Sequence, residues 1–138
     1  MNSVKLKIKG TQIRPDGEKD TIELVTEGKC YEKNNCTFLV YDESEISGME
    51  GSTTTLKIEE KKIMMKRFGA NESKLIFEKD VKHVSVYQTI YGNMDMEVTT
   101  SHIDIKKDQK GLKKINLSYK LCVCGNEDIK NKLCVEVI

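Results

Sequence analysis

The chain has 138 residues, of which 33% are charged, and its 23 basic and 22 acidic side chains leave a formal net charge of +1 at pH 7. The length is that of one domain. A charge balance so close to neutral provides no field of one sign, so we expect neither a nucleic acid nor an anionic membrane as a partner.

The first residues set a pattern that continues to the end of the chain. From Val4 to Lys9 apolar residues alternate with lysine, and this period of two is typical of a strand with one dry and one wet face. We expect ten strands, at residues 4–11, 20–32, 36–41, 52–59, 62–68, 73–78, 82–89, 94–107, 113–124 and 129–137. The links are of hairpin length and no segment has a helical pattern. The sequence therefore predicts an all-β fold: a single closed, antiparallel, up-and-down barrel of about eight to ten strands over residues 1–138.

Turn and corner signals separate these strands. Pro15 presets φ, and the Asp16–Gly17 pair that follows accepts unusual dihedral angles. The two glycines near residue 50 indicate a sharp corner. The acidic side chains around that corner, at positions 43, 45 and 50, are interpreted as a solvated rim rather than as an acid–base pair. Half of the threonine row at 53–55 would face a cavity.

The cysteines indicate the compartment. Five cysteines, without an apolar run of signal-peptide or transmembrane length, are typical of reduced thiols in the cytoplasm. The absence of tryptophan and of an aromatic girdle argues against an outer-membrane barrel. We therefore expect a cytoplasmic monomer or homodimer.

Cys122 and Cys124 share a strand face and raise the question of a metal site. The alternation of apolar residues in the last two strands requires an odd number of residues between them, which places Cys134 opposite Ser118 or Lys120. Cys134 is then two to four positions from Cys122, whereas zinc holds its sulfurs about 2.3 Å from one centre. We expect no metal site, and nothing in the sequence indicates a cofactor.

Three segments resemble the motifs of one family. They are residues 45–58 (EISGMEGSTTTLKI), residues 67–77 (RFG followed by SKLIF) and residues 87–99, which begin YQTIYG. They are similar to the YwiB-like proteins, uncharacterised bacterial proteins with a calycin-type β-barrel, the architecture of lipocalins and fatty-acid-binding proteins. Ile90 stands where that family commonly has a proline. The resemblance implies a barrel, and the calycin analogy implies a ligand cavity. It implies no activity, because the family has no agreed one.

Arg67 is the first candidate for a ligand-binding residue. It shares a strand face with Ile63 and Met65, so an inward face would put a guanidinium inside the barrel, paired with a carboxylate of the protein or an anionic ligand. Fatty-acid-binding relatives in the wider fold use arginine and tyrosine in this way. We favour the ordinary alternative, in which Arg67 reaches solvent near a strand end or pairs with a surface glutamate, because charges are rarely buried.

A polar row in the strand at 82–89 alternates with two valines. The row is His83, Ser85, Tyr87 and Thr89, and facing inward it would line a wet cavity. For His83 and Ser85 we favour an outward orientation, since polar side chains are mostly exposed. Tyr87 is expected to be a partly buried packing residue.

No sequence signature indicates catalysis. The two histidines are His83 and His102, and no HExxH, GxSxG, P-loop or GxGxxG motif accompanies them. We therefore expect that the protein is not an enzyme, and a small hydrolase or isomerase built around His83 remains the third alternative.

The sequence favours a non-enzymatic barrel that binds a small lipophilic or anionic ligand, since a barrel of this strand number has room for one. Arg67 would hold an anion, Tyr87 would donate a hydrogen bond, and Tyr91 with Met49 would line the mouth. The full candidate ligand-binding set is Arg67, His83, Tyr87, Thr89, Tyr91 and Met49. The alternative is a structural or protein–protein interaction barrel with a filled core. Cavity volume distinguishes the two, because ligand pockets begin at about 300 Å³.

Overall fold

A computed structural model describes residues 2–43, 50–69 and 72–138, and in these ranges the backbone forms ten strands. The strands are β1 (Asn2–Ile13), β2 (Lys19–Lys33), β3 (Cys36–Asp42), β4 (Ser52–Ile58), β5 (Lys62–Gly69), β6 (Ser73–Glu78), β7 (Lys82–Thr89), β8 (Gly92–Asp108), β9 (Gly111–Val123) and β10 (Ile129–Val137). Their ends differ from the predicted ones by at most two residues. The described part of the chain contains no helix that could cross a membrane.

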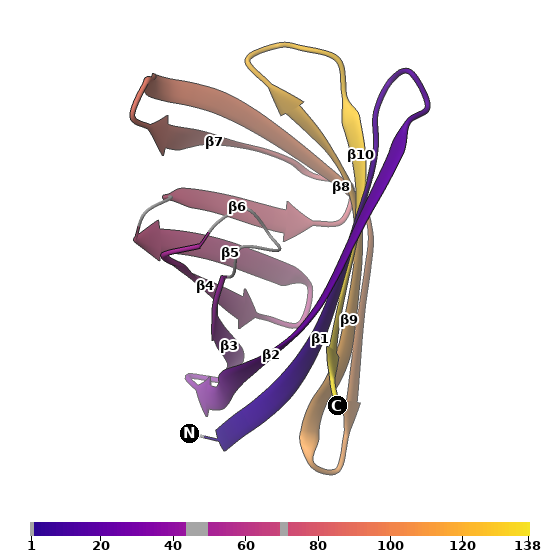
Figure 1. Ribbon diagram of the computed structural model, residues 1–138. Helices are drawn as coiled ribbons and strands as arrows, with labels where there is room; N and C mark the ends of the chain where they lie inside the picture. Colours follow the sequence, from indigo (N-terminus) through magenta and orange to yellow (C-terminus); the bar gives the residue numbers. More distant parts are fainter. Residues whose placement is uncertain (1, 44–49, 70–71) are drawn as a thin grey trace.

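The strands form one antiparallel sheet in the order β6-β5-β4-β3-β2-β1-β10-β9-β8-β7. Consecutive strands pair along the chain except β6 and β7, and β1 also pairs with β10. The sheet curls until its two end strands, β6 and β7, approach each other (Figure 1). Among the described residues they are joined by the single bridge Glu72–Gln88, and a second bridge links Lys79 to Thr100 of β8. The predicted all-β, up-and-down barrel is confirmed, as a nearly closed barrel.

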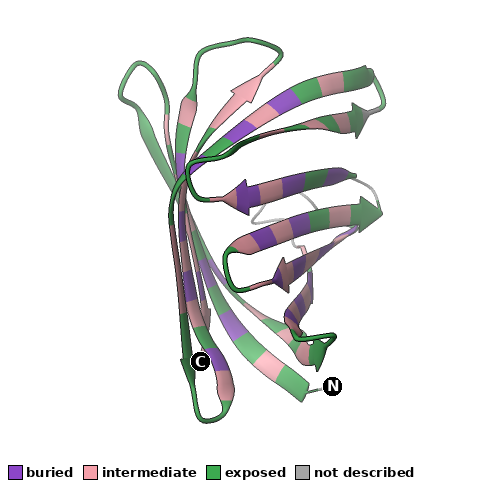
Figure 2. Cartoon of the chain, turned by 180° about the vertical axis from the view of Figure 1, so that it is seen from behind, coloured by how far each residue is buried: buried purple, intermediate pink, exposed green. Residues whose placement is uncertain are grey.

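Alternation decides which residues form the core. In β4, every second residue from Ser52 to Ile58 is buried, and the residues between them are partly exposed. Figure 2 shows these buried residues as bands that alternate along the strands. Thr54 is thus an inward-facing threonine, as half of the threonine row was expected to be.

The core fills only one half of the barrel. We call the end that carries the β1–β2, β3–β4, β5–β6, β7–β8 and β9–β10 links the open end, and the opposite one the filled end. The apolar side chains with less than 2% exposure lie in the middle and toward the filled end: Phe77, Leu6, Leu39, Leu56, Ile58, Ile63, Ile115, Leu117, Val98 and Val135. Toward the open end, inward-facing residues such as Ile22, which is 43% exposed, are only partly covered.

The β9–β10 hairpin has a different register from the one expected. Cys134 lies opposite Asn116 rather than opposite Ser118 or Lys120. Residues 122–128 lie outside the ladder between the two strands, because the last residues of β9 pair with β8 alone. Their number is odd, as the apolar alternation requires, but larger than the three or five predicted. The five cysteines are free thiols.

Candidate ligand-binding cavity

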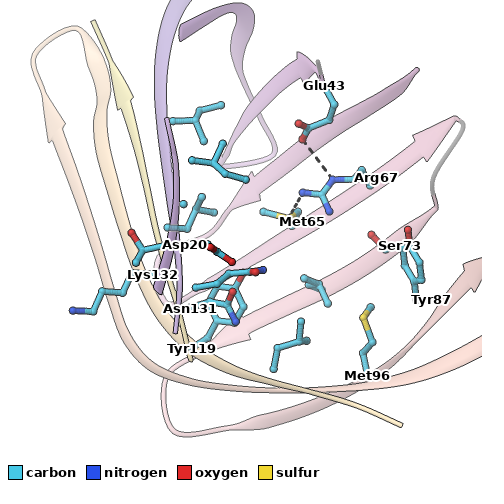
Figure 3. Close-up of a pocket in the computed structure, with 18 of the residues that line it drawn as sticks. Asp20, Glu43, Met65, Arg67, Ser73, Tyr87, Met96, Tyr119, Asn131 and Lys132 are labelled. Atoms are coloured by element: carbon cyan, nitrogen blue, oxygen red, sulfur yellow. Dashed lines mark hydrogen bonds and ion pairs between the residues drawn. The ribbon is translucent and has the colours of Figure 1, made fainter. Parts of the chain in front are cut away.

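A cavity of about 510 Å³ occupies the open half of the barrel. Figure 3 shows the side chains around it. The apolar side chains that line it are Ile8, Ile22, Leu24, Met65, Leu75, Met94, Met96, Leu121, Val123 and Leu133. The volume exceeds the ~300 Å³ at which ligand pockets begin, so a filled core describes only the other half of the barrel.

The open half is hollow because of the residues at its inward positions. Gly10 of β1 has no side chain, and Ser73 of β6 has a small one, and both line the cavity. Closer to the filled end, the inward positions of the same two strands carry larger apolar side chains, Leu6 on β1 and Phe77 on β6, which are fully buried. Smaller inward residues at one end leave space that water or a ligand can enter.

Arg67 points into this cavity from β5. Its side chain is 15% exposed, and its Nε lies 3.5 Å from Oε1 of Glu43, whose side chain is 4% exposed. The same Nε donates a hydrogen bond to Thr54 Oγ1 at 3.2 Å, and the Thr54 hydroxyl donates to Glu43 at 2.5 Å. The surface interpretation of Arg67 is therefore wrong: its strand face turns inward, and the carboxylate beside it is buried, which compensates the guanidinium charge.

The guanidinium keeps part of its donor capacity for another molecule. Within the described residues both oxygen contacts of Arg67 are made by Nε, and Nη2 lies 3.5 Å from the sulfur of Met65 (Figure 3). Sulfur is a weak acceptor, whereas the two terminal nitrogens form a planar fork that suits a carboxylate or a phosphate. The arrangement can therefore bind an anion at the cavity wall.

Two inward-facing tyrosines, Tyr41, which is buried, and Tyr119, which is partly buried, add neutral hydroxyl groups. Burial raises the pKa of Tyr41, the Glu43 carboxylate raises it further, and the Tyr41 hydroxyl hydrogen-bonds with Thr54 and Glu43. Burial also raises the pKa of Tyr119, which the Arg67 charge lowers in part. Both side chains line the cavity, so each presents a protonated hydroxyl at neutral pH.

Three members of the polar row of β7, His83, Ser85 and Tyr87, face inward. His83 is 25% exposed and its Nε2 lies 3.0 Å from Glu78 Oε1, while Val84 is 65% exposed on the outer face. The outward orientation expected for His83 and Ser85 is therefore wrong, and the reason lies in the pairing: His83 is opposite Val98, a fully buried residue of β8, so both share the inner face. The Ser85 hydroxyl is buried without a partner among the described residues.

The structure bears differently on the predictions for the remaining candidate residues. Tyr87 packs against the core and lines the cavity, as expected. Tyr91, in the β7–β8 link at the open end, is 94% exposed and is not among the described residues that line the cavity, so its place at the mouth stays a prediction. Thr89 pairs with Gly92 through the backbone, but its side chain lies outside what the structure describes. Met49 lies outside the described residues.

Comparison with known proteins identifies the family. The model of a domain of unknown function, DUF1934, matches residues 6–135. The chain belongs to the DUF1934 family. The uncharacterized beta-barrel protein YwiB of Bacillus subtilis (strain 168) is 28% identical to it over 116 residues, which are 83% of this chain and 78% of that protein. The crystal structure of YwiB from Bacillus subtilis superposes with a TM-score of 0.73 at 19% identity, covering 99% of this chain and 93% of that one. The resemblance to YwiB-like proteins is confirmed, and with it the fold.

Sequence reasoning missed part of this DUF1934 site. Tyr41 and Tyr119 were not candidates, Thr54 was only one member of a row, and Glu43 was placed on a solvated rim. The missing signal is the register of two hairpins, which puts Tyr41, Thr54 and Arg67 directly opposite one another on three adjacent strands. Cross-strand neighbours have Cβ atoms about 5 Å apart, so residues separated by 13 positions in sequence meet in one row.

Proposed function

We propose that this DUF1934 protein is a non-enzymatic binding protein for a small, mostly apolar molecule that carries an anionic group. The observation that carries the proposal is the cavity of about 510 Å³, with its apolar wall and one guanidinium at its side. Apolar pockets with a few convergent polar groups are the usual form of small-molecule sites. The calycin analogy, in which a barrel interior holds a lipophilic ligand, supports the same reading.

Each polar residue would have its own role in ligand binding. Glu43 and Thr54 hold Arg67 by its Nε, which leaves the terminal nitrogens directed at the ligand. Tyr119 and Tyr87 line the same space and could each donate a hydrogen bond to a ligand oxygen. The apolar wall would exclude water from the rest of the ligand, and burial of its surface would supply most of the affinity.

The experiment compares dodecanoate with dodecanol by isothermal titration calorimetry. In the variant Arg67→Met/Glu43→Gln both members of the ion pair become neutral, so that neither is left as a buried, uncompensated charge. We expect this variant to bind dodecanoate at least about tenfold more weakly and dodecanol unchanged, because only the anion uses the guanidinium.

A second variant tests the cavity itself. Leu121→Trp adds an indole inside the cavity, and we expect it to abolish binding of both ligands. Its control is Lys120→Trp, which places the same side chain at the adjacent, exposed position. The proposal is wrong if the unmodified protein binds neither ligand, or if Leu121→Trp binds both as tightly as the unmodified protein does.

A further inference from the structure

The outer surface of the barrel carries an apolar strip along β7. Val84 and Val86 are 65% and 46% exposed there, because they alternate with residues that face the interior. The strip continues onto β6 and β5, where Ile76 lies directly opposite Met64 and both side chains are partly exposed. An exposed apolar strip with charged residues along its edges is typical of a surface that binds another protein.

A basic edge borders the strip on the side of β5 and β6. Lys66 and Lys74 are exposed and lie directly opposite each other, and both line an outer groove of about 440 Å³ together with Val86. Like charges at directly opposite positions destabilise a sheet. Neither lysine forms an ion pair among the described residues, and this includes Glu72, which lines the same groove. Both charges are therefore available to a partner.

An acidic edge borders the strip on the side of β8. Asp95 lies directly opposite Val86, and Glu97 lies directly opposite Val84. Glu97 contacts Lys82 of its own chain at 3.1 Å, whereas Asp95 is exposed and has no ion pair in the described part of the chain. Across the neighbouring strands β6, β7 and β8 (Figure 1), the outer surface thus changes from positive to apolar to negative.

This order of charges fits a second copy of the chain. Two copies that pack outer face against outer face around a two-fold axis parallel to β7 place β6 of each copy over β8 of the other. Such a rotation keeps the height along the strands. Lys74 and Asp95 both flank Val86, so each Lys74 then lies over Asp95 of the other copy. A two-fold axis perpendicular to the strands would place the two basic edges over each other, so the charges select one orientation.

We propose that this protein forms a homodimer through the outer faces of β6, β7 and β8, around a two-fold axis parallel to β7. Val84 and Val86 lie at the centre of the interface, and Lys74 of each copy pairs with Asp95 of the other, with Lys66 beside it. Sheets that pack face to face are about 10 Å apart, a distance that a lysine and an aspartate span together. The inference does not depend on the proposed function, because none of these five residues lines the cavity.

The first experiment is sedimentation velocity of the full chain over a series of concentrations up to about 1 mM, which covers weak dimers. The test variant Val84→Ser/Val86→Ser removes the apolar centre. Its control, Val25→Ser, removes a valine that is 52% exposed on the outer face of β2. We expect the test variant to dimerise at least about tenfold more weakly than the unmodified protein, because apolar burial is lost, and the control to dimerise unchanged.

The second experiment reverses charges to test the orientation. Lys74→Asp and Asp95→Lys each place like charges across the interface, so each variant alone should dimerise at least about tenfold more weakly than the unmodified protein. In an equimolar mixture the first variant supplies two acidic positions and the second supplies two basic ones, so both intermolecular pairs are restored. We therefore expect the mixture to form a heterodimer whose affinity is close to that of the unmodified homodimer.

Three results would overturn the proposal. The unmodified protein could be a monomer at every concentration in the series. A dimer could persist unchanged in Val84→Ser/Val86→Ser, which would mean that the copies meet through another surface. The mixture of Lys74→Asp with Asp95→Lys could dimerise no better than either variant alone, which would exclude the pairing of these two residues across the interface.

Discussion

Single residues inside the open half have chemistry that depends on their neighbours. Tyr41 is 4% exposed, yet its hydroxyl meets Thr54 and the Glu43 carboxylate, so it is buried with hydrogen-bond partners. The neutral phenol suits this place, whereas a phenolate would be both desolvated and close to a carboxylate. Arg67 shows the reverse case, since a buried carboxylate and a hydroxyl make its own burial acceptable.

Tyr41 and Tyr119 predict a loss of stability in alkali. The pKa values of Tyr41 and Tyr119 are raised in the folded protein, so above the unfolded value of about 10 the unfolded chain binds fewer protons and the free energy of unfolding falls. The contribution is complete below about pH 10 and is lost as the pH rises from there. Urea unfolding between pH 8 and pH 11 measures it.

Substitution by phenylalanine separates this effect from lysine titration. Tyr41→Phe and Tyr119→Phe should each show a shallower fall of the free energy of unfolding above pH 10 than the unmodified protein, whereas Tyr91→Phe, at a position 94% exposed, should not. Equal slopes in all the proteins would mean that neither Tyr41 nor Tyr119 is linked to unfolding.

At the scale of strands, the site depends on a single row across the sheet. Gly28 of β2, Tyr41, Thr54, Arg67 and Ser73 follow one another as directly paired residues from β2 to β6. The row begins at a close approach: a Cβ on Gly28 would lie 2.7 Å from the carbonyl oxygen of Val40 and 2.9 Å from a methyl carbon of Leu6. The absence of a side chain at Gly28 therefore leaves room for the Val40 carbonyl group and the Leu6 side chain.

Gly28→Ala is expected to destabilise the protein by about 1–3 kcal/mol, because the added methyl group meets backbone as well as side chain. Gly10→Ala is the matched control: Gly10 also lies within a strand, on β1, and a Cβ there meets nothing within 4 Å. We expect Gly10→Ala to raise the free energy of unfolding by no more than about 1 kcal/mol, because alanine lowers the conformational entropy of the unfolded chain. Urea unfolding of both variants gives the comparison, and equal losses would show that Gly28 is not a packing constraint.

The strands themselves could be predicted, but their meeting points could not. Alternation and turn residues are local signals, so residues 73–78, 82–89 and 129–137 were predicted with the bounds that the structure has. The inward face of Arg67 was also available from its parity with Ile63 and Met65. The buried partner Glu43 was not, because it lies 24 positions away and meets Arg67 only through the registers of two hairpins. The polar row of β7 was ambiguous for the same reason.

The whole molecule is a barrel with two unequal halves, and among the described strands no ladder joins β6 to β7. The filled end carries most of the fully buried apolar residues, which hold the sheet curled. The open end has a cavity in place of a core. Whether the interior is hollow depends on the summed volume of side chains from all ten strands, which no single segment of sequence reveals.

This division predicts an order of hydrogen exchange. β1 is hydrogen-bonded to neighbours on both sides, β2 and β10, whereas β7 has a ladder with β8 alone among the described strands. Amides that open without global unfolding exchange first. Hydrogen exchange followed by mass spectrometry should therefore show β6 and β7 exchanging at least about tenfold faster than β1. Uniform protection would mean that β6 and β7 are paired in solution.

The pairing of β1 with β10 makes the order of strands in space independent of where the polypeptide is cut. The first and last strands in sequence are neighbours, with Leu6 opposite Val137, and among the described strands the ladder is interrupted between β6 and β7 alone. A circular permutant that starts at β7, joins β10 to β1 through a short linker and finishes at β6 would pass through the sheet from one end to the other in strict spatial order. The interruption of the ladder would then coincide with the ends of the chain.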